Sequence, residues 1–551
     1  MTIVSIIFFI LSCAVNLKQH FAILFSRTFI FILFSLSVLS YKILFLDDLS
    51  KGISIFGGLF NITYINSTFN IFIYLLSLFI ILFNSYYPRN VLRNDGYNIF
   101  SKFTVSKNIS NTGDERYRIT EYSLILLFIL TGGQFLMASS DIVSVFLSIE
   151  LQSYGLYILC TTYRNSETST SSGLTYFLIG GLASCFILLS TSLLYANSGC
   201  TSLESFYIIS NIYESLENIK GYNSISVYNW YNSYYLYISL IILSIGFLIK
   251  ISAAPFHFWS PDVYDGVPTV VTTFISILPK ITILIFILDI LININVNLYE
   301  ENWTSIFIVS SLLSLVIGTV LGLTQTRIKR LFAYSTISHI GFLLLALGNN
   351  SRESIQAFLF YLIQYSVSNL NAFFILITIG YSLYTYVYKE NKNNKTEVYE
   401  IVSEEDVKKE LNNSPIQYID QLKGYFYVNP LLSLSLAITL FSFAGVPPLI
   451  GFFAKLMVLS ASIDNEYIFM SIVAILTSVI GGVYYLAIIR KIFFEDSIYT
   501  INNSKYNNNI KLSSSLTITI SILTSIMMLF ILIPTEFLNF LLIISMILLN
   551  Y

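Results

Sequence analysis

The feature that most constrains this chain is a series of long apolar runs separated by short polar stretches. A helix needs about 20 mostly apolar residues to cross the hydrocarbon core of a bilayer. Only 11% of the 551 residues are charged, whereas soluble proteins carry roughly 25%. The sequence therefore predicts an integral membrane protein. The apolar runs, about fourteen by the length criterion, lie at about 2–16, 22–40, 68–86, 121–137, 141–162, 172–197, 234–258, 267–292, 303–323, 331–349, 354–386, 430–462, 466–491 and 512–550.

We expect all of these runs to be helices, because a backbone amide in hydrocarbon must find its partner within its own segment. A membrane barrel would instead show short alternating strands, which this sequence lacks. The predicted fold is an all-α polytopic membrane protein with about 14 transmembrane helices. The first run, 2–16, has no basic start and no small-residue cleavage pattern, so it is predicted to be a retained helix.

Several classes of function lack their sequence signals here. The four cysteines are scattered, with no C-x-x-C pair for a metal, haem or iron–sulfur cluster. There is no glycine-rich dinucleotide motif and no phosphate-binding loop. The net charge of -2, without a long basic stretch, gives no reason to expect nucleic-acid binding. We therefore predict that no cofactor is bound by this chain.

Two apolar runs are interrupted by clusters of proline and glycine, which remove backbone donors and loosen the helix. In transporters, two broken helices at corresponding positions of two repeats indicate a substrate path near the membrane midplane. The alternative is a pair of kinks that only improve packing. The interrupting residues are Pro255, Pro261, Gly266 and Pro268 in the first run, and Gly445, Pro447, Pro448 and Gly451 in the second.

Four ionisable residues lie deep within apolar runs, where each charge costs about 2.5–3.5 kcal/mol on insertion scales. They are Glu150, Lys250, Lys280 and Lys455. Burial disfavours the ammonium form of a lysine, whereas a nearby carboxylate favours it. If Glu150 lies against Lys250, moving or neutralising the carboxylate would make the lysine release its proton. We interpret the four as a proton relay; the alternative is a set of snorkelling side chains or satisfied ion pairs.

Two histidines are further candidates for the relay, because imidazole titrates near neutrality and can pass a proton between its nitrogens. His257 lies in the first interruption and His339 in an apolar helix; the alternative is a hydrogen-bonded packing role. Neither has a second ligand four residues away, so no metal site is predicted. Asp262 and Asp265 are expected to cap a helix or lie at the interface, and the basic cluster 326–330 is expected to fix the orientation of the chain.

Four segments carry a resemblance to a known family. They are FLSIELQSYGLY, LIKISAAPFHFWSPDVYDGVPTVVTTFISILPK, RIKRLFAYSTISHIGF and FAGVPPLIGFFAK. Over about residues 120–495 the chain resembles the antiporter-like membrane subunits of respiratory complex I. The resemblance implies about fourteen helices with two inverted repeats of five helices each, broken at the seventh and twelfth spans. It divides the chain into N-terminal helices and a loop (1–120), a first repeat (121–292), a second repeat with a polar insertion at 389–427 (303–494), and a C-terminal helix region (495–551).

The resemblance also implies a function. Members of this family pump protons across the mitochondrial inner membrane, driven by quinone reduction in other subunits of the NADH:ubiquinone oxidoreductase. Glu150 and Lys250 would be the family's acid–lysine pair, Lys280 the bridging lysine of the eighth span, and Lys455 the lysine of the twelfth. NADH, flavin, iron–sulfur clusters and ubiquinone would then be bound by other subunits. The implied partners are membrane-arm and accessory subunits and lipids such as cardiolipin, with no nucleic acid; the family pattern gives no role to the loops 87–120, 198–233 and 389–427.

Two other hypotheses remain open on the sequence. A cation/proton antiporter subunit would share the broken helices and the lysines. Sodium prefers carboxylate and carbonyl ligands, and the deep sites here are mostly lysines, which weighs against direct sodium transport. A membrane scaffold would use the buried charges only to orient helices.

Overall fold

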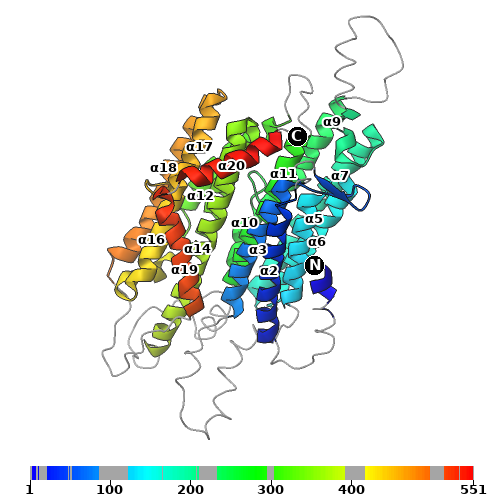
Figure 1. The fold of residues 1–551 in the computed structure, drawn as a ribbon. Helices are drawn as coiled ribbons and strands as arrows, with labels where there is room; N and C mark the ends of the chain where they lie inside the picture. The colour runs from blue at the N-terminus through cyan, green and yellow to red at the C-terminus, as the bar shows by residue number, and fades with distance from the viewer. Residues whose placement is uncertain are drawn as a thin grey trace, which may run out of the picture.

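The computed structural model describes residues 3–7, 10, 22–46, 49, 52–85, 122–163, 166–206, 208–209, 233–293, 303–390, 416–496, 514–532 and 534–549. These residues form a bundle of long helices with one short β-hairpin (Figure 1). Nine of the described helices are long and apolar enough to cross a membrane, and three shorter apolar helices accompany them. The expected count of about fourteen spans is compatible with this; the run 2–16 lies mostly outside the described residues.

The N-terminal region contains two helices, α2 (Ala22–Ile43) and α3 (Tyr64–Ser85), joined through the hairpin. Its strands, β1 (Ile53–Ile55) and β2 (Phe60–Ile62), pair antiparallel with Ile53 opposite Ile62. The prediction of helices alone missed this hairpin, because strands of three residues are too short to show an alternating pattern. The hairpin packs on the next helices, where the Ser140 N–H donates to the Leu59 carbonyl at 3.1 Å.

The remaining helices follow the predicted runs closely. The first group comprises α5 (Tyr122–Ala138), α6 (Ile142–Thr161), α7 (Glu167–Ser198), α9 (Ser233–Ile251), α10 (Trp259–Gly266) and α11 (Thr269–Asn293). The second comprises α12 (Ser305–Leu323), α13 (Ile328–Asn349), α14 (Arg352–Glu390), the 3-10 turns η5 (Ile419–Leu422) and η6 (Tyr425–Tyr427), α16 (Pro430–Ala444), α17 (Ile450–Asp464) and α18 (Ile468–Phe493). Both predicted interruptions are present, between α9 and α10 and between α16 and α17.

The C-terminal run 512–550 was expected to be one span and is instead two helices, α19 (Ser514–Leu529) and α20 (Pro534–Leu549), with a 3-10 turn, η7 (Phe530–Leu532), between them. A proline is well tolerated at the first position of a helix but not in its interior, so Pro534 starts a new helix. Helix α20 lies against α14 and α3, across the long helices (Figure 1).

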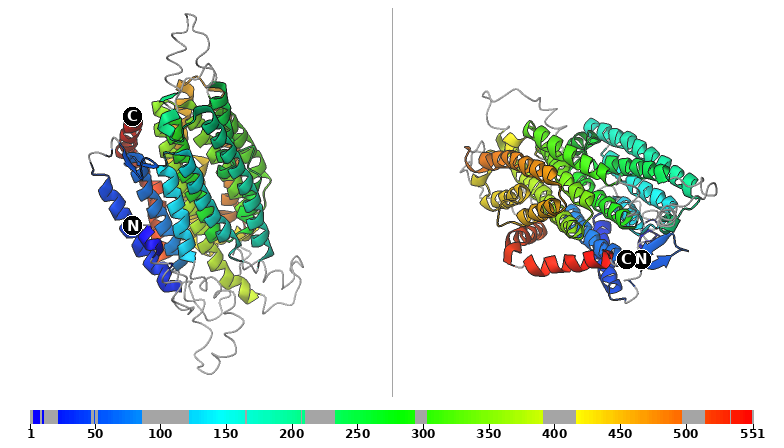
Figure 2. Two further views of the ribbon diagram at one scale, coloured as in Figure 1. Left: turned by 90° about the vertical axis from the view of Figure 1, so that its right-hand side faces the viewer. Right: turned by 90° about the horizontal axis from the view of Figure 1, so that it is seen from above.

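Three helices form the buried centre of the bundle. In α11, α13 and α14, 89%, 94% and 89% of the most apolar span is buried, whereas the corresponding share is 28% in α7 and 39% in α18. Seen from above, the first group of helices lies at one end of an elongated cross-section and α16–α18 at the other (Figure 2). Polar groups carried by the central helices are therefore shielded by protein, whereas α7 and α18 present apolar side chains on the outside.

Candidate functional site

The first broken helix ends beside an acid–lysine pair. Pro255 cannot donate a backbone hydrogen bond, and α9 stops at Ile251, one residue after Lys250. The Ile249 carbonyl, near the end of α9, accepts hydrogen bonds from the Trp259 Nε1–H at 2.9 Å and from the Ser252 N–H at 3.2 Å. The break thus places Lys250 in the last turn of a helix that ends inside the bundle.

Lys250 and Glu150 lie next to each other, as the hypothesis of a coupled acid–lysine pair requires. The Lys250 Nζ is 3.6 Å from Glu150 Oε1, and the two side chains are 6% and 14% exposed. The Lys250 ammonium also donates to the Tyr157 hydroxyl at 3.3 Å. Two charges shielded from water stabilise one another strongly, and removing either leaves the other unpaired at high cost. This pair can therefore couple the position or charge of the acid to the protonation of the lysine.

Lys280 is buried without such a counter-charge. It is 2% exposed in the middle of α11, and its ammonium donates to the Thr336 hydroxyl of α13 at 3.3 Å. The Tyr264 ring of α10 lies beneath it, with its centroid 5.6 Å from Nζ. Within the described residues, Lys280 forms no ion pair at 4.0 Å or less. The described partners of the Lys280 ammonium are thus a hydroxyl and an aromatic ring, both uncharged.

His339 continues from Thr336 along the same face of α13. The hydroxyl of Tyr361 lies 2.7 Å from its Nδ1, and that of Tyr485 lies 3.5 Å from its Nε2. Both ring nitrogens therefore face a group that can donate or accept a proton. The two tyrosines were missed in the sequence because they come from α14 and α18, far from His339 along the chain.

Lys455 is held by the second broken helix. Its ammonium donates to the carbonyls of Phe443 and Ala444, at 2.9 and 3.0 Å, at the C-terminal end of α16. A helix C-terminus carries partial negative charge, which stabilises a cation. Gly445 follows with φ +81°, and a Cβ there would lie 2.9 Å from the Lys455 Cδ. In the part of the chain that the structure describes, this lysine is therefore held by backbone carbonyls and not by a carboxylate.

His257 is not brought into hydrogen-bonding contact with any of these lysines. It is 3% exposed, and its Nδ1 lies 3.3 Å from the Pro255 carbonyl two residues earlier. The contact is local to the first break. A role for His257 in proton transfer stays a prediction.

A hydrogen bond that the sequence did not predict connects α6, which carries Glu150, with α11, which carries Lys280. The Gln152 Nε2 donates to the Thr282 hydroxyl at 3.0 Å, two residues beyond each charged residue. Gly133 of α5 packs against both, since a Cβ there would lie 2.8 Å from Thr282 Cγ2. This hydrogen bond fixes α6 against α11 close to both charges.

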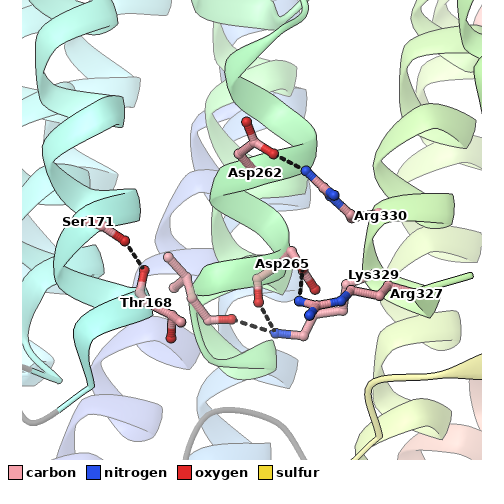
Figure 3. Close-up of polar contacts among 8 residues, drawn as sticks. Thr168, Ser171, Asp262, Asp265, Arg327, Lys329 and Arg330 are labelled. Atoms are coloured by element: carbon pink, nitrogen blue, oxygen red, sulfur yellow. Dashed lines mark hydrogen bonds and ion pairs between the residues drawn. The ribbon is translucent and has the colours of Figure 1, made fainter. Parts of the chain in front are cut away.

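The basic cluster 326–330 does more than the orientation role predicted for it. Arg327 and Arg330, at the start of α13, form ion pairs with Asp265 and Asp262 of α10, the first at 2.6 Å (Figure 3). The expectation that both aspartates cap a helix or lie at the interface stays a prediction, to which the structure adds these two ion pairs. No sequence signal links these residues, because more than 60 positions separate each pair.

Among the described residues, no group of three or more His, Cys, Asp or Glu side chains is placed to hold a metal ion. The contacts described above join hydroxyls, an imidazole and amines, which are groups that can exchange protons.

Comparison with known proteins identifies relatives along nearly the whole chain. Residues 139–481 match the family described as NADH:quinone oxidoreductase/Mrp antiporter, TM. The chain is 42% identical to NADH-ubiquinone oxidoreductase chain 2 of Rhizopus oryzae, over 98% of each chain. It is 32% identical to NADH-quinone oxidoreductase subunit N of Pelagibacter ubique, over 84% of this chain and 88% of the relative.

The fold has a counterpart among solved structures. The chain is similar to one in respiratory complex I from Thermus thermophilus, solved with bound aureothin, with a TM-score of 0.65 and 21% identity over 98% of this chain and 99% of that one. At this identity the likeness concerns the fold. The predicted antiporter-like, multi-pass helical fold is confirmed.

Proposed function

The chain belongs to the family of NADH-ubiquinone oxidoreductase chain 2 and subunit N, membrane subunits of respiratory complex I, and on this basis we propose that its buried acid and lysines relay protons. The relay consists of Glu150, Lys250, Lys280 and Lys455, with His339 between the last two. The buried Glu150–Lys250 contact of 3.6 Å carries the proposal, because it provides a site where a change in charge at the acid alters the lysine.

The first step of the relay is electrostatic. When Glu150 takes up a proton or moves away, Lys250 loses its counter-charge, and its ammonium becomes the stronger acid. The released proton passes to the neutral amine of Lys280, across a gap that we expect water molecules to bridge. A hydroxyl contacts the lysine at each end of this gap: Tyr157 contacts Lys250, and Thr336 contacts Lys280.

The second half of the relay leads from Lys280 to Lys455. Thr336 and His339 lie one turn apart on α13 and face α14, so a proton leaving Lys280 can reach the imidazole. His339 can then release a proton from its other nitrogen, because each ring nitrogen has its own tyrosine hydroxyl. Phe443 packs against His339, with ring centroids 5.2 Å apart, and its carbonyl holds the Lys455 ammonium.

The setting of the relay follows from the relatives. We infer that the chain works in the membrane arm of complex I, in the mitochondrial inner membrane, beside other core and accessory subunits and lipids such as cardiolipin. We also infer that NADH, flavin, iron–sulfur clusters and ubiquinone are bound by other subunits, so that the energy for pumping reaches this chain through protein contacts. Purification of the intact complex and identification of its subunits and lipids by mass spectrometry tests the setting.

Substitution of the lysines tests the relay. Lys250→Met and Lys280→Met, in the assembled complex, are expected to lower protons pumped per NADH oxidised by about tenfold or more, because proton transfer by a positioned group typically contributes at least that much. Lys423→Met is the matched control, since Lys423 forms exposed ion pairs outside the bundle centre. Assembled Lys250→Met and Lys280→Met complexes that pump at the normal ratio would support the scaffold hypothesis.

A cation/proton antiporter is the second candidate, because the matching family includes Mrp antiporters. Radioactive sodium uptake by vesicles containing the complex separates the two. We expect no sodium flux that depends on Lys280, because the deep groups are mainly amines and sodium prefers oxygen ligands. Sodium flux that Lys280→Met abolishes would favour the antiporter.

A further inference from the structure

The short helix α10 is contacted by three cationic side chains from the start of α13, one at its first turn and two at its C-terminal end. Arg327, Lys329 and Arg330, which we call the α13 clamp, all reach α10 (Figure 3). The two arginine side chains are 40% and 39% exposed and pair with aspartates. Lys329 lies between them but is only 2% exposed.

Lys329 makes its bonds to backbone carbonyls. Its ammonium donates to the carbonyls of Asp265 and Val267 at 3.0 and 2.7 Å. The Asp265 carbonyl belongs to the last turn of α10 and the Val267 carbonyl to the residue that follows it, and no later turn satisfies them. The negative end of the helix dipole also favours a cation there. An orientation signal needs only exposed charge near the membrane surface, so the burial of Lys329 points to a second role.

The two helices that the clamp joins supply both neighbours of Lys280. Tyr264, whose ring lies under the Lys280 ammonium, is next to Asp265 on α10. Thr336, which accepts a hydrogen bond from Lys280, is seven residues after Lys329 on α13. Seven residues are about two helical turns, so Lys329 and Thr336 lie on the same face. The separation of α10 and α13 therefore determines how Tyr264 and Thr336 enclose Lys280.

The opposite side of α10 is packed closely against α7. A Cβ at Gly266 would lie 2.7 Å from the Thr168 carbonyl of α7. Helix α10 is therefore fixed by steric contact with α7 and by charged and hydrogen-bonded contacts with α13. The second set comes from three side chains and can be weakened one contact at a time by substitution.

We propose that the α13 clamp is a positioning device for Lys280, with Lys329 as its central residue. By holding the end of α10 on the start of α13, it keeps Tyr264 and Thr336 at the distances that Lys280 needs to exchange its proton. The clamp also connects the first broken helix to the second repeat. The inference rests on the proposed relay, since it assigns the clamp an effect on a relay residue.

The first test replaces Lys329 by Met in the intact complex. We expect protons pumped per NADH oxidised to fall at least about threefold, because small misplacements of reacting groups can cost up to about 10²-fold in rate. Lys329→Arg should restore most of the ratio, since a guanidinium can still donate to both carbonyls. Lys491→Met is the matched control: it removes another lysine–aspartate contact, to Asp420 at 2.7 Å, that touches neither α10 nor Lys280.

A double-variant comparison shows whether the effect passes through Lys280. If the clamp acts on the Thr336 contact, Lys329→Met combined with Thr336→Val should reduce pumping little more than the stronger single variant does. Independent, multiplying effects would overturn the proposal. So would a Lys329→Met complex with the normal ratio, or one whose ratio matches that of Lys491→Met.

A charge swap covers the case in which Lys329→Met does not assemble. Asp262 and Arg330 are both substantially exposed, so Asp262→Arg should assemble, with a lowered pumping ratio. Adding Arg330→Asp should restore the ratio, and failure to restore it would overturn the proposal. Lys280→Met distinguishes failure of the relay proposal from failure of the clamp proposal. Normal pumping by the Lys280→Met complex would overturn the relay. Lost pumping by Lys280→Met together with normal pumping by Lys329→Met would overturn only the clamp.

Discussion

The lysines of the proposed relay differ in what contacts their ammonium groups. Lys250 has a carboxylate at 3.6 Å, Lys280 a threonine hydroxyl, and Lys455 two helix-end carbonyls. A carboxylate brings a full opposite charge, which a hydroxyl or a carbonyl oxygen does not. The proposed relay thus places its three amines in three different surroundings.

Gly445 offers a direct test of how Lys455 is placed. We expect Gly445→Ala to lower the pumping ratio, because the new methyl group would displace the Lys455 side chain from the carbonyls of α16. The positive φ adds roughly 1–3 kcal/mol of backbone strain. Gly482→Ala in α18 is the control, since a Cβ there has nothing within 4 Å. Proton pumping in the assembled complexes is the measurement, and equal ratios in both variants would refute the expectation.

The two tyrosines at His339 give a graded prediction. Tyr361→Phe removes a hydroxyl at 2.7 Å and Tyr485→Phe one at 3.5 Å. An unsatisfied buried polar group costs about 1–3 kcal/mol, so Tyr361→Phe should reduce pumping more than Tyr485→Phe does. Comparison of pumping ratios in the two isosteric variants checks this. A larger effect of Tyr485→Phe than of Tyr361→Phe would refute the expectation.

At the scale of elements, close helix contacts through glycine decide how charged residues meet. Gly132 of α5 touches α6, since a Cβ there would lie 2.6 Å from the Gln152 backbone nitrogen. This contact sets the distance between α5 and α6, the helix that carries Glu150. Backbone atoms cannot move aside as a side chain can, so this contact has no room for a larger residue.

Gly132→Ala is therefore expected to reduce the amount of assembled complex. Overpacking of this kind costs about 1–3 kcal/mol, and the shift should separate Gln152 from Thr282. Gly181→Ala in α7 is the matched control, because the space around Gly181 is open and alanine is the better helix former. Native gel electrophoresis of membranes measures assembly; normal assembly of Gly132→Ala would refute the expectation.

At the scale of the whole molecule, the sequence predicted helices and breaks well but not the contacts between helices. Apolar length and the proline clusters at Pro255 and Pro447 locate the elements, because these signals are local. Helices that are apolar all round carry little information about which face meets which neighbour. Pairs such as Gln152 with Thr282, or Asp265 with Arg327, are therefore visible only in three dimensions.

The unequal partners of Lys250 and Lys455 have an electrical consequence for the two ends of the molecule. If Glu150 stays ionised, it and Lys250 sum to zero, and departure of a hydrogen ion from Lys250 leaves one negative charge there. Among the described residues, Lys455 has neutral carbonyl oxygens as its hydrogen-bond partners, so arrival of that ion creates one positive charge. Opposite charges attract across a poorly polarisable interior, and the ion is pulled back toward its origin. Uptake of a second hydrogen ion by Glu150, the first step of the proposed relay, would remove this pull.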